Sequence, residues 1–363
     1  MTAPPSGPYD LSPEALGELL GAEPAYRVGQ VWKSLYERGL RPEEMTDLPR
    51  TLRLRLETAL PPALRLRAES TSSGGDTLKW LWELRDGAQV ETVLMHYPGR
   101  STVCVSSQAG CAMGCSFCAT GQAGFRRHLT TGEIVEQVAL ARRRSSPRRL
   151  SNVVFMGMGE PLANYDRVWE AVERIHSDMG MSARHLTLST VGVVPGIRRL
   201  SREALPVNLA VSLHAANDEL RDRLVPINRR YPLAALTEAC RQYITAKGRR
   251  LSFEWALISG VNDRPSDARE LAERAVPLGA HVNLIPLNPT PGYRVRGSDP
   301  ATVRAFRDRL VASGVNATVR SFRDGLVSRG VNATVRRNRG TDIDAACGQL
   351  AAREPSGGIE MPD

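Results

Sequence analysis

From Ser101 onward the sequence alternates short apolar runs with longer amphipathic stretches, and this alternation limits the possible folds more than any other feature. Short runs rich in β-branched residues predict strands, and the longer periodic stretches predict helices. The expected strands are residues 102–106, 152–156, 185–190, 207–214, 251–258 and 281–287, and the expected helices include 131–143, 165–178, 233–246 and 265–276. Six units of a strand followed by a helix predict an α/β fold with a parallel sheet, arranged as an open or partial barrel. A doubly wound sheet is the alternative.

The first hundred residues follow a different pattern. Residues 10 to about 62 are predicted to be helical, with Ser12 as an N-cap and Pro13 in the first turn. Residues 77–84 and 89–96 are predicted to be strands joined by a turn at Asp86 and Gly87. We therefore expect a helical accessory domain (1–62), a β-hairpin extension (63–100), a barrel with a C-terminal loop (101–350) and a disordered tail (351–363).

The chain of 363 residues carries a formal net charge of +9, and most of its positive residues are arginines. Arginine binds phosphate oxygens through paired N–H groups, so this excess favours a polyanionic partner. Arginines are densest in residues 141–149, which we interpret as a solvated loop, with contact to an RNA backbone as the alternative. No apolar run approaches the ~18 residues of a membrane span, and the N-terminus lacks the pattern of a signal peptide. Both observations favour a cytoplasmic protein without membrane contact.

Four of the six cysteines fall within 15 residues. Among these, Cys111, Cys115 and Cys118 are spaced so that three thiolates on one loop could hold a soft metal centre. An iron–sulfur cube usually takes four cysteines, so three ligands leave one iron with an open position for a substrate. Zinc is the alternative, with His128 as the fourth ligand.

Polar residues and glycines follow the ends of four of the expected strands. In a βα barrel these ends meet on one rim, where active sites are built. The residues are Gly157, Gly159 and Glu160, then Ser189 and Thr190, then His214, and finally Asn288. Glycines let the backbone approach a ligand, and Glu160 can accept hydrogen bonds from an ammonium group.

Several segments around these residues resemble the RNA adenine methyltransferases of the radical S-adenosylmethionine (SAM) superfamily. They are 104–121 (CVSSQAGCAMGCSFCATG), 156–162 (MGMGEPL), 188–190 (LST), 212–215 (SLHA), 225–228 (VPIN), 284–289 (LIPLNP) and 342–350 (DIDAACGQL). The similarity runs from about Tyr9 to Leu350. It implies a partial (β/α)6 TIM-like radical SAM barrel with an N-terminal helical accessory domain, a [4Fe-4S] cluster and SAM.

The resemblance also implies a role for each matching position. Cys111, Cys115 and Cys118 match the cluster ligands. The SAM-contacting positions match Gly159, Glu160, Ser189, Ser212, Leu213, His214 and Asn288. Cys347 matches the cysteine that is methylated first, and Cys104 matches its partner in a transient disulfide. Glu91 matches the general base.

The chemistry of the target explains why such a family needs two further cysteines. An adenine ring carbon that carries hydrogen is a poor nucleophile, so it cannot attack the methyl group of SAM directly. The resemblance implies that one SAM methylates Cys347, and that the deoxyadenosyl radical from a second SAM removes a hydrogen atom from that methyl group. The sulfur-bound methylene radical then adds to the ring, Glu91 removes the ring proton, and Cys104 displaces Cys347 as a disulfide.

The motifs are most similar to the dual-specificity enzymes that methylate adenine C2 in 23S ribosomal RNA and in some transfer RNAs. Their relatives that methylate adenine C8 share most of the motifs and are the alternative. The resemblance implies 23S rRNA and tRNA as partners, an electron donor such as flavodoxin or ferredoxin, and a monomer. Two alternatives to an RNA methyltransferase are a zinc-stabilised RNA-binding protein without catalysis and a radical SAM enzyme that modifies a protein. The second would need neither Cys104 nor Cys347.

The sequence departs from the family pattern in two places. Asn338 stands where Thr is more usual, and residues 301–316 (ATVRAFRDRLVASGVN) are nearly repeated as 317–332 (ATVRSFRDGLVSRGVN). Each copy is one helix-to-strand step, and the family fold has one such step before the loop that carries Cys347. We expect the copy nearer to Cys347 to fill that place, and the first copy, 306–320, to bulge out or to pack at the periphery.

Overall fold

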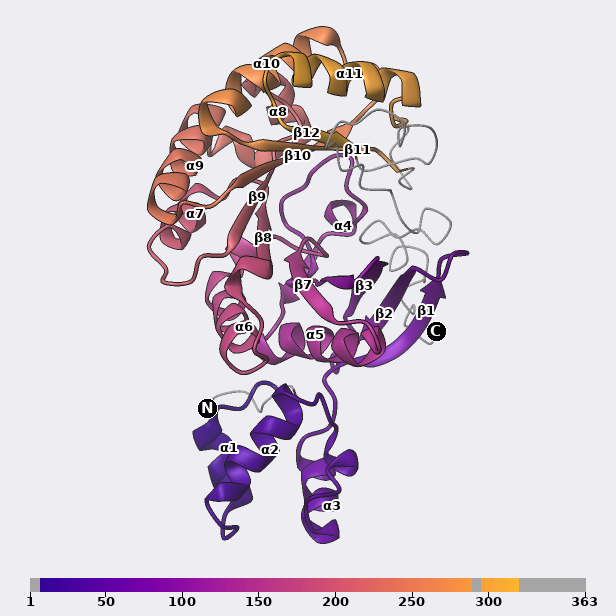
Figure 1. Ribbon diagram of the computed structural model, residues 1–363, viewed down its shortest axis with the longest axis vertical. Helices are drawn as coiled ribbons and strands as arrows, with labels where there is room; N and C mark the ends of the chain where they lie inside the picture. Colours follow the sequence, from indigo (N-terminus) through magenta and orange to yellow (C-terminus); the bar gives the residue numbers. More distant parts are fainter. Residues whose placement is uncertain (1–6, 289–294, 320–363) are drawn as a thin grey trace, which may run out of the picture.

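The computed structural model describes residues 7–288 and 295–319 (Figure 1), and its main feature is a ten-stranded sheet in the order β1-β2-β3-β4-β7-β8-β9-β10-β11-β12. Three strands are antiparallel to their neighbours: β1 (Arg65–Thr71), β2 (Thr77–Glu83) and β3 (Gln89–Tyr97). The others run parallel: β4 (Arg100–Cys104), β7 (Leu150–Phe155), β8 (Leu186–Thr190), β9 (Asn208–Ser212), β10 (Leu251–Leu257), β11 (His281–Pro286) and β12 (Ala317–Val319).

The parallel strands follow one another in sequence order, which confirms an α/β fold in the form of a partial barrel. A doubly wound sheet reverses its strand order at a switch point, and the described part of this sheet has no reversal, so that alternative is wrong. Helices lie along the outer side of the curved sheet (Figure 1), and the core of buried Leu, Val, Ile and Ala side chains lies between the two layers. These helices are α5 (Thr131–Ser145), α6 (Tyr165–Ser177), α7 (Val194–Leu200), α8 (Asp218–Leu224), α9 (Leu233–Lys247), α10 (Pro265–Ala275) and α11 (Pro300–Ala312).

The N-terminal segment forms a separate group of helices below the barrel (Figure 1). It contains α1 (Pro13–Leu20), α2 (Tyr26–Tyr36) and α3 (Arg50–Ala59). Ser12 caps α1 as expected, because its hydroxyl accepts a hydrogen bond from the amide of Ala15 at 3.2 Å. Short 3-10 helices complete the described chain at η1 (Pro42–Glu44), η2 (Pro161–Ala163), η3 (Ala183–His185), η4 (Pro226–Arg229) and η5 (Val276–Leu278).

The arginine-rich stretch 141–149 differs from its expected form. Helix α5 continues to Ser145, so the first part of the stretch is not a loop. Arg142 donates to the carbonyl of Tyr36 at 3.2 Å, and Arg143 pairs with Glu44 at 2.5 Å. Arg144 pairs with the carboxylate of Glu69 at 2.9 Å. These three arginines therefore fasten α5 to the N-terminal helices and to β1, although Arg143 and Arg144 remain exposed, as Arg148 and Arg149 are.

The first copy of the tandem repeat forms the last described step of the barrel. Phe306 of α11 is 1 % exposed, and its ring centroid lies 6.0 Å from that of Trp255 on β10. Strand β12 pairs in parallel with β11, with Ala317 opposite Val282. Our expectation that the first copy lies at the periphery is therefore wrong. It is the first helix–strand step that the chain reaches after β11, and it buries its apolar face there. Its strand β12 consists of residues 317–319, which begin the second copy, and the rest of that copy, 320–332, lies outside the described residues.

Candidate active site

The three clustered cysteines lie on a loop closed by a small antiparallel hairpin. Its strands are β5 (Gln108–Gly110) and β6 (Phe125–His128), and a short helix, α4 (Ala119–Gln122), follows Cys118. The amide of Cys111 donates to the carbonyl of Gly124 at 2.9 Å. A Cβ at Gly110 would lie 1.9 Å from that same carbonyl oxygen, so glycine is required for the hairpin to close.

The loop faces the carboxyl ends of the parallel strands, and together they line one cavity. The cavity brings together most of the residues that the sequence indicated: Cys111, Cys115, Cys118, Gly159, Glu160, Ser189, Ser212 and His214. Leu213 does not line it, because this residue is buried in the core behind the strand. Asn288 does not line it either, and it is the last described residue before the gap at 289–294.

Two glycines let the loop after β7 pack against the segment that follows β4. A Cβ at Gly157 would lie 2.5 Å from the carbonyl oxygen of Val105, and one at Gly159 would lie 2.5 Å from Cβ of Gln108. Gly159 also has a φ of 100°, which side chains rarely tolerate. Both positions therefore need glycine for contact with the protein itself, before any ligand is considered.

Glu160 is held by its surroundings at the base of the cavity. Its two carboxylate oxygens accept hydrogen bonds from the amides of Leu162, at 3.0 Å, and Val191, at 2.8 Å. Its own amide donates to the side-chain oxygen of Gln108 at 2.8 Å. Burial raises the pKa of Glu160 to about 7, and the hydrogen bonds from Val191, Thr190 and Leu162 oppose that rise.

The cysteine thiols are in an environment that disfavours the free thiolate. Burial raises the pKa of Cys111 to about 11 and also raises that of Cys115, and the neighbouring cysteines add to both effects. Binding of a metal centre must therefore release protons from these thiols, which couples cluster loading to pH.

The geometry does not support zinc with His128 as a fourth ligand. His128 lies on β6, where its Nδ1 is 3.0 Å from the side-chain nitrogen of Gln108, and it does not line the cysteine cavity. Among residues 7–288 and 295–319, no three His, Cys, Asp or Glu side chains are arranged around a single ion.

His214 has a conformation that its backbone neighbours fix. Its φ is 58°, in the left-handed region, and its Nδ1 accepts a hydrogen bond from the amide of Ala256 at 2.9 Å. Asn262 donates to the His214 carbonyl at 2.8 Å. Burial, together with the charge of Arg221, lowers the pKa of His214 to about 3, so the ring is neutral and carries its proton on Nε2.

Cys104 and Glu91 lie on the inner face of the sheet, the face that the cavity occupies. Cys104 is paired with Val93 across β3 and β4, and directly opposed residues point to the same side. Glu91 is two residues from Val93 on the same strand, so it shares that face. Its carboxylate contacts the ammonium of Lys79 at 3.1 Å. The structure thus brings Cys104 and Glu91 near one another, whereas Cys347 lies outside the described residues.

Glu254 also lines the cavity, and sequence reasoning missed it. It is an acidic residue inside the apolar strand β10 and is only 6 % exposed. The side-chain amide of Asn283 on β11 donates to its carboxylate at 2.6 Å. A charged residue in the middle of an apolar strand was the signal that could have identified it.

The fold and the cysteine site define a radical SAM enzyme, and comparisons agree with this class. A family model described as the radical SAM superfamily matches residues 105–274. The chain is similar to a crystal structure of a radical SAM methyltransferase from Sphaerobacter thermophilus, with a TM-score of 0.86 and 47% identity, covering 94% of this chain and 98% of that one.

Curated relatives narrow the class further. A probable dual-specificity RNA methyltransferase RlmN from Parafrankia is 50% identical, covering 97% of this chain and 93% of its own. Dual-specificity RNA methyltransferase RlmN 1 from Myxococcus xanthus is 50% identical over 95% of this chain and 94% of its own. The chain therefore belongs to the RlmN family of dual-specificity RNA methyltransferases, whose radical SAM domain implies a [4Fe-4S] cluster and SAM. No helix among the described residues is long and apolar enough to cross a membrane.

Proposed function

We propose that this protein methylates the C2 carbon of adenine in 23S ribosomal RNA and in tRNA, through a methyl group carried first by Cys347 and released by Cys104. The observation that carries the proposal is the position of Cys104. A thiol on the inner face of the sheet, on the same face as Glu91, is what release of a sulfur-bound intermediate requires, whereas a radical SAM enzyme that modifies a protein would need neither Cys104 nor Cys347.

Cys111, Cys115 and Cys118 fit the role of cluster ligands. The three thiols line one cavity from a single loop, which leaves one iron of a cube without a protein ligand. Beside them, the buried hydroxyl of Thr120 has no hydrogen-bond partner among the described residues, as expected for a group that awaits a ligand. When bound, the cluster supplies the electron that generates the deoxyadenosyl radical from SAM.

The polar residues of the rim are proposed to bind SAM. The Glu160 carboxylate keeps acceptor capacity beyond its protein hydrogen bonds, so it can also accept from the SAM ammonium group. The neutral ring of His214 offers an N–H donor at Nε2. We propose that Gly159, Ser189 and Ser212 supply further contacts of this site. The contacts of Leu213, which is buried in the core, and of Asn288, which does not line the cavity, stay predictions from the family resemblance.

Glu91 is proposed to take the ring proton, and Cys104 to close the disulfide with Cys347. The support for these roles is that both side chains point to the same face of the sheet, where a base and a thiol could act on one adenine. The cycle consumes two SAM molecules, one for the methyl group and one for the radical. We further propose a cytoplasmic monomer that takes its electron from flavodoxin or ferredoxin and is divided into the four segments given above.

The test is the identity of the methylated nucleoside. Reconstituted protein, SAM and a reductant are incubated with unmodified 23S rRNA or tRNA transcripts, and the RNA is digested to nucleosides for mass spectrometry against isomer standards. The proposal expects 2-methyladenosine from both RNAs. Formation of 8-methyladenosine would instead assign the C8 activity, and methylation that survives in Cys104→Ala at the normal rate would contradict the disulfide step.

A further inference from the structure

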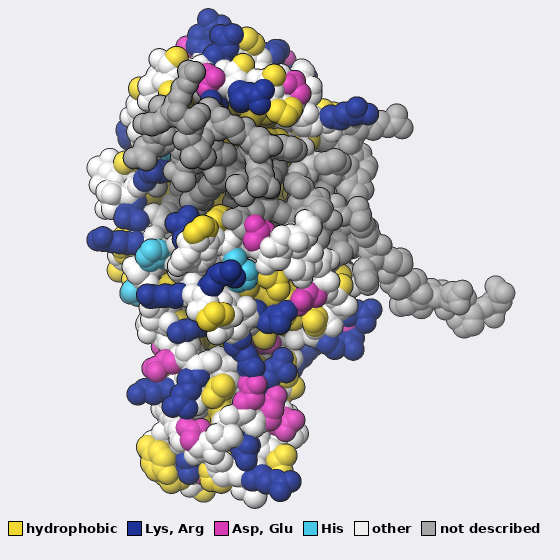
Figure 2. All heavy atoms as spheres, turned by 45° about the vertical axis from the view of Figure 1, so that its right-hand side comes forward, with side chains coloured by type: hydrophobic (Ala, Val, Ile, Leu, Met, Phe, Trp, Pro, Cys, Tyr) yellow, Lys and Arg dark blue, Asp and Glu magenta, His cyan; other side chains and the backbone are white. Residues whose placement is uncertain are grey.

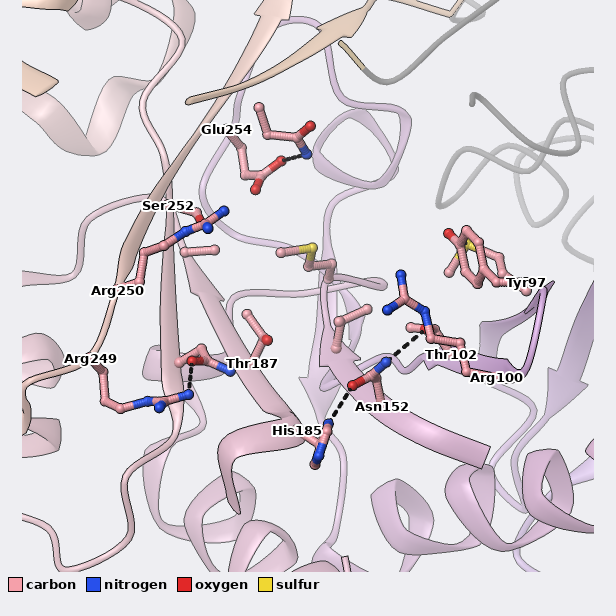
Figure 3. Close-up of a pocket in the computed structure, with 16 residues that line it drawn as sticks. Tyr97, Arg100, Thr102, Asn152, His185, Thr187, Arg249, Arg250, Ser252 and Glu254 are labelled. Atoms are coloured by element: carbon pink, nitrogen blue, oxygen red, sulfur yellow. Dashed lines mark hydrogen bonds between the residues drawn. The ribbon is translucent and has the colours of Figure 1, made fainter. Parts of the chain in front are cut away.

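A second cavity lies inside the barrel, toward the amino ends of the strands (Figure 3). The two cavities share Met156 and Glu254 in their walls, so they are adjacent. The lower cavity is lined by inward-facing residues of seven neighbouring strands, from β3 to β11. Nothing in the mechanism proposed above uses it.

The side chains of this lower cavity are strongly cationic. Arg100 enters from the β4 side, and Arg249 and Arg250 enter from the start of β10 (Figure 3). Glu254 is the one carboxylate among the described lining residues, and it lies at the upper end, bonded to Asn283. Because Arg100 and Arg250 are exposed and pair with no carboxylate in the described part of the chain, their charge is available to a ligand.

Other side chains in the cavity are held in place before any ligand arrives. Arg249 donates to the side-chain oxygen of Asn208 at 2.7 Å. His185 Nδ1 lies 2.9 Å from the side-chain oxygen of Asn152, whose amide donates in turn to Thr102 at 3.4 Å. The row formed by Thr102, Asn152 and His185 runs from β4 across β7 to η3 at the floor of the cavity (Figure 3). At its edge, the guanidinium of Arg100 lies 5.2 Å from the ring centroid of Tyr97.

We propose that this cavity binds the sugar–phosphate backbone beside the target nucleotide, with Arg100 and Arg250 each contacting a phosphate from opposite walls. The inference rests on the proposed function, and it adds the place where the RNA is held. An enzyme that modifies a base must take the base out of its stack, so the flanking backbone has to follow it into the site. Because the two cavities are adjacent, we propose that the base lies near the cluster while its flanking phosphates lie among the arginines of the lower cavity.

The chemistry of the lining selects this ligand. Guanidinium groups bind phosphate oxygens in a paired geometry, and amides with hydroxyls suit the ribose. Tyr97 offers a face on which a neighbouring base can stack. Lys and Arg side chains are also spread over the outer surface of the molecule (Figure 2), so general electrostatic attraction to RNA is expected in addition. The test must therefore distinguish phosphate binding in the cavity from attraction to the outer surface.

The test compares Arg100→Gln, Arg250→Gln and the double variant with a control, Arg269→Gln, which removes an exposed arginine from α10 on the outer layer. Binding of an unmodified tRNA transcript is measured by fluorescence anisotropy between about 50 and 200 mM KCl. Each cavity variant is expected to bind about tenfold more weakly at low salt, because it loses a charge-assisted contact. The slope of log affinity against log salt should fall by about 0.7 for each arginine lost.

Two further measurements distinguish the loss of a phosphate contact in the cavity from a general loss of charge and from damage to the cluster site. Arg250→Lys keeps the charge and should retain most of the salt slope, whereas Arg269→Gln should leave it unchanged. Release of deoxyadenosine from SAM without RNA should be unaffected in every variant, which shows that the cluster site is intact. If wild-type protein methylates the transcript and the double variant keeps the wild-type slope and affinity, the inference is overturned. If wild-type protein binds the transcript but methylates no adenine, the proposed function fails, and the slopes still decide whether the cavity holds RNA.

Discussion

The ammonium group of Lys79 lies 3.1 Å from the carboxylate of Glu91, and both side chains are fully buried. They come from neighbouring antiparallel strands, β2 and β3, and point to the inner face of the sheet. Taking two charges out of water is costly, so each buried charge has to be stabilised by the opposite charge of its partner. Lys79 is therefore a positioning residue for Glu91, the proposed base next to Cys104.

We expect Lys79→Met to lower the free energy of unfolding by about 3 to 5 kcal/mol, because it leaves the Glu91 carboxylate buried without its cation. A second variant that combines Lys79→Met with Glu91→Leu removes both charges and should recover most of the loss. Urea denaturation of both variants measures the difference. If Lys79→Met is as stable as the double variant, Lys79 does not stabilise the buried carboxylate of Glu91.

Glu136 gives a pH dependence that can be measured. This residue of α5 accepts hydrogen bonds from the amides of Ala63 at 3.0 Å and Leu64 at 3.3 Å, which join the N-terminal segment to the barrel. Burial nevertheless raises its pKa from 4.5 to about 7. The folded protein then binds more protons than the unfolded chain between these pH values, so this contribution to stability is complete below pH 4.5 and is lost as the pH rises to 7.

The matching variant is Glu136→Gln, which does not titrate. Relative to wild type, its free energy of unfolding should gain about 3 kcal/mol between pH 4.5 and pH 7. Denaturant unfolding of both proteins across this range gives the comparison. A difference that stays constant with pH would place the carboxylate of Glu136 in water rather than in the interface.

The cluster ligands can be tested by measuring the iron and sulfide content of the purified variants. Cys111→Ala, Cys115→Ala or Cys118→Ala should each lose cluster iron and the cleavage of SAM, because a cube with two protein thiolates is poorly held. Cys240→Ala is the control, since Cys240 is buried in α9 and does not line the cavity. Iron and sulfide are measured after anaerobic purification. Full iron content in any of the three variants would remove that cysteine from the ligand set.

Cys104→Ala should leave SAM cleavage intact but trap RNA on the protein. The adduct forms on Cys347, and no second thiol remains to displace it. A nuclease-sensitive shift in a denaturing gel detects the adduct, and the shift should disappear when Cys347 is also replaced by Ala. Normal turnover by Cys104→Ala would show that the disulfide step is wrong.

Much of the barrel could be predicted because local pattern and topology agree. The strand pair β2–β3 follows from its alternation and from the turn at Asp86 and Gly87. Strand β1 escaped prediction, because its residues are mostly polar and exposed, and only its pairing with β2 makes it a strand. Rim residues were predictable because parallel strands end on the same side, whatever their side chains are.

Features that depend on distant partners could not be predicted. The acceptors of Arg142 and Arg143 lie about a hundred residues away in the sequence, and composition cannot distinguish such bonds from solvent contact. Leu213 precedes His214 in the motif, yet the alternation of the strand turns it into the core. The two repeat copies have nearly the same pattern, so pattern alone could not decide which one packs on β11.

The repeat allows a final prediction with two matched deletions. Deleting 301–316 or deleting 317–332 leaves a single copy followed by the same ATVR segment. In either product an apolar face with the spacing of Val303, Phe306 and Leu310 remains available to pack against β10 and β11. Both products should therefore fold and methylate RNA, because the register of the last helix and strand is preserved.

The two products should still differ in stability, since the copies differ at few positions. Deletion of 301–316 places Gly325 in the helix where the other product keeps Arg309. Glycine inside a helix costs about 1 kcal/mol relative to a good helix former, so this product should unfold at lower urea concentration. Replacing Gly325 by Arg in that product should remove most of this difference in stability. If instead both deletions fold equally well but lose methylation while SAM cleavage persists, the 16 additional residues are needed to bring Cys347 to the site.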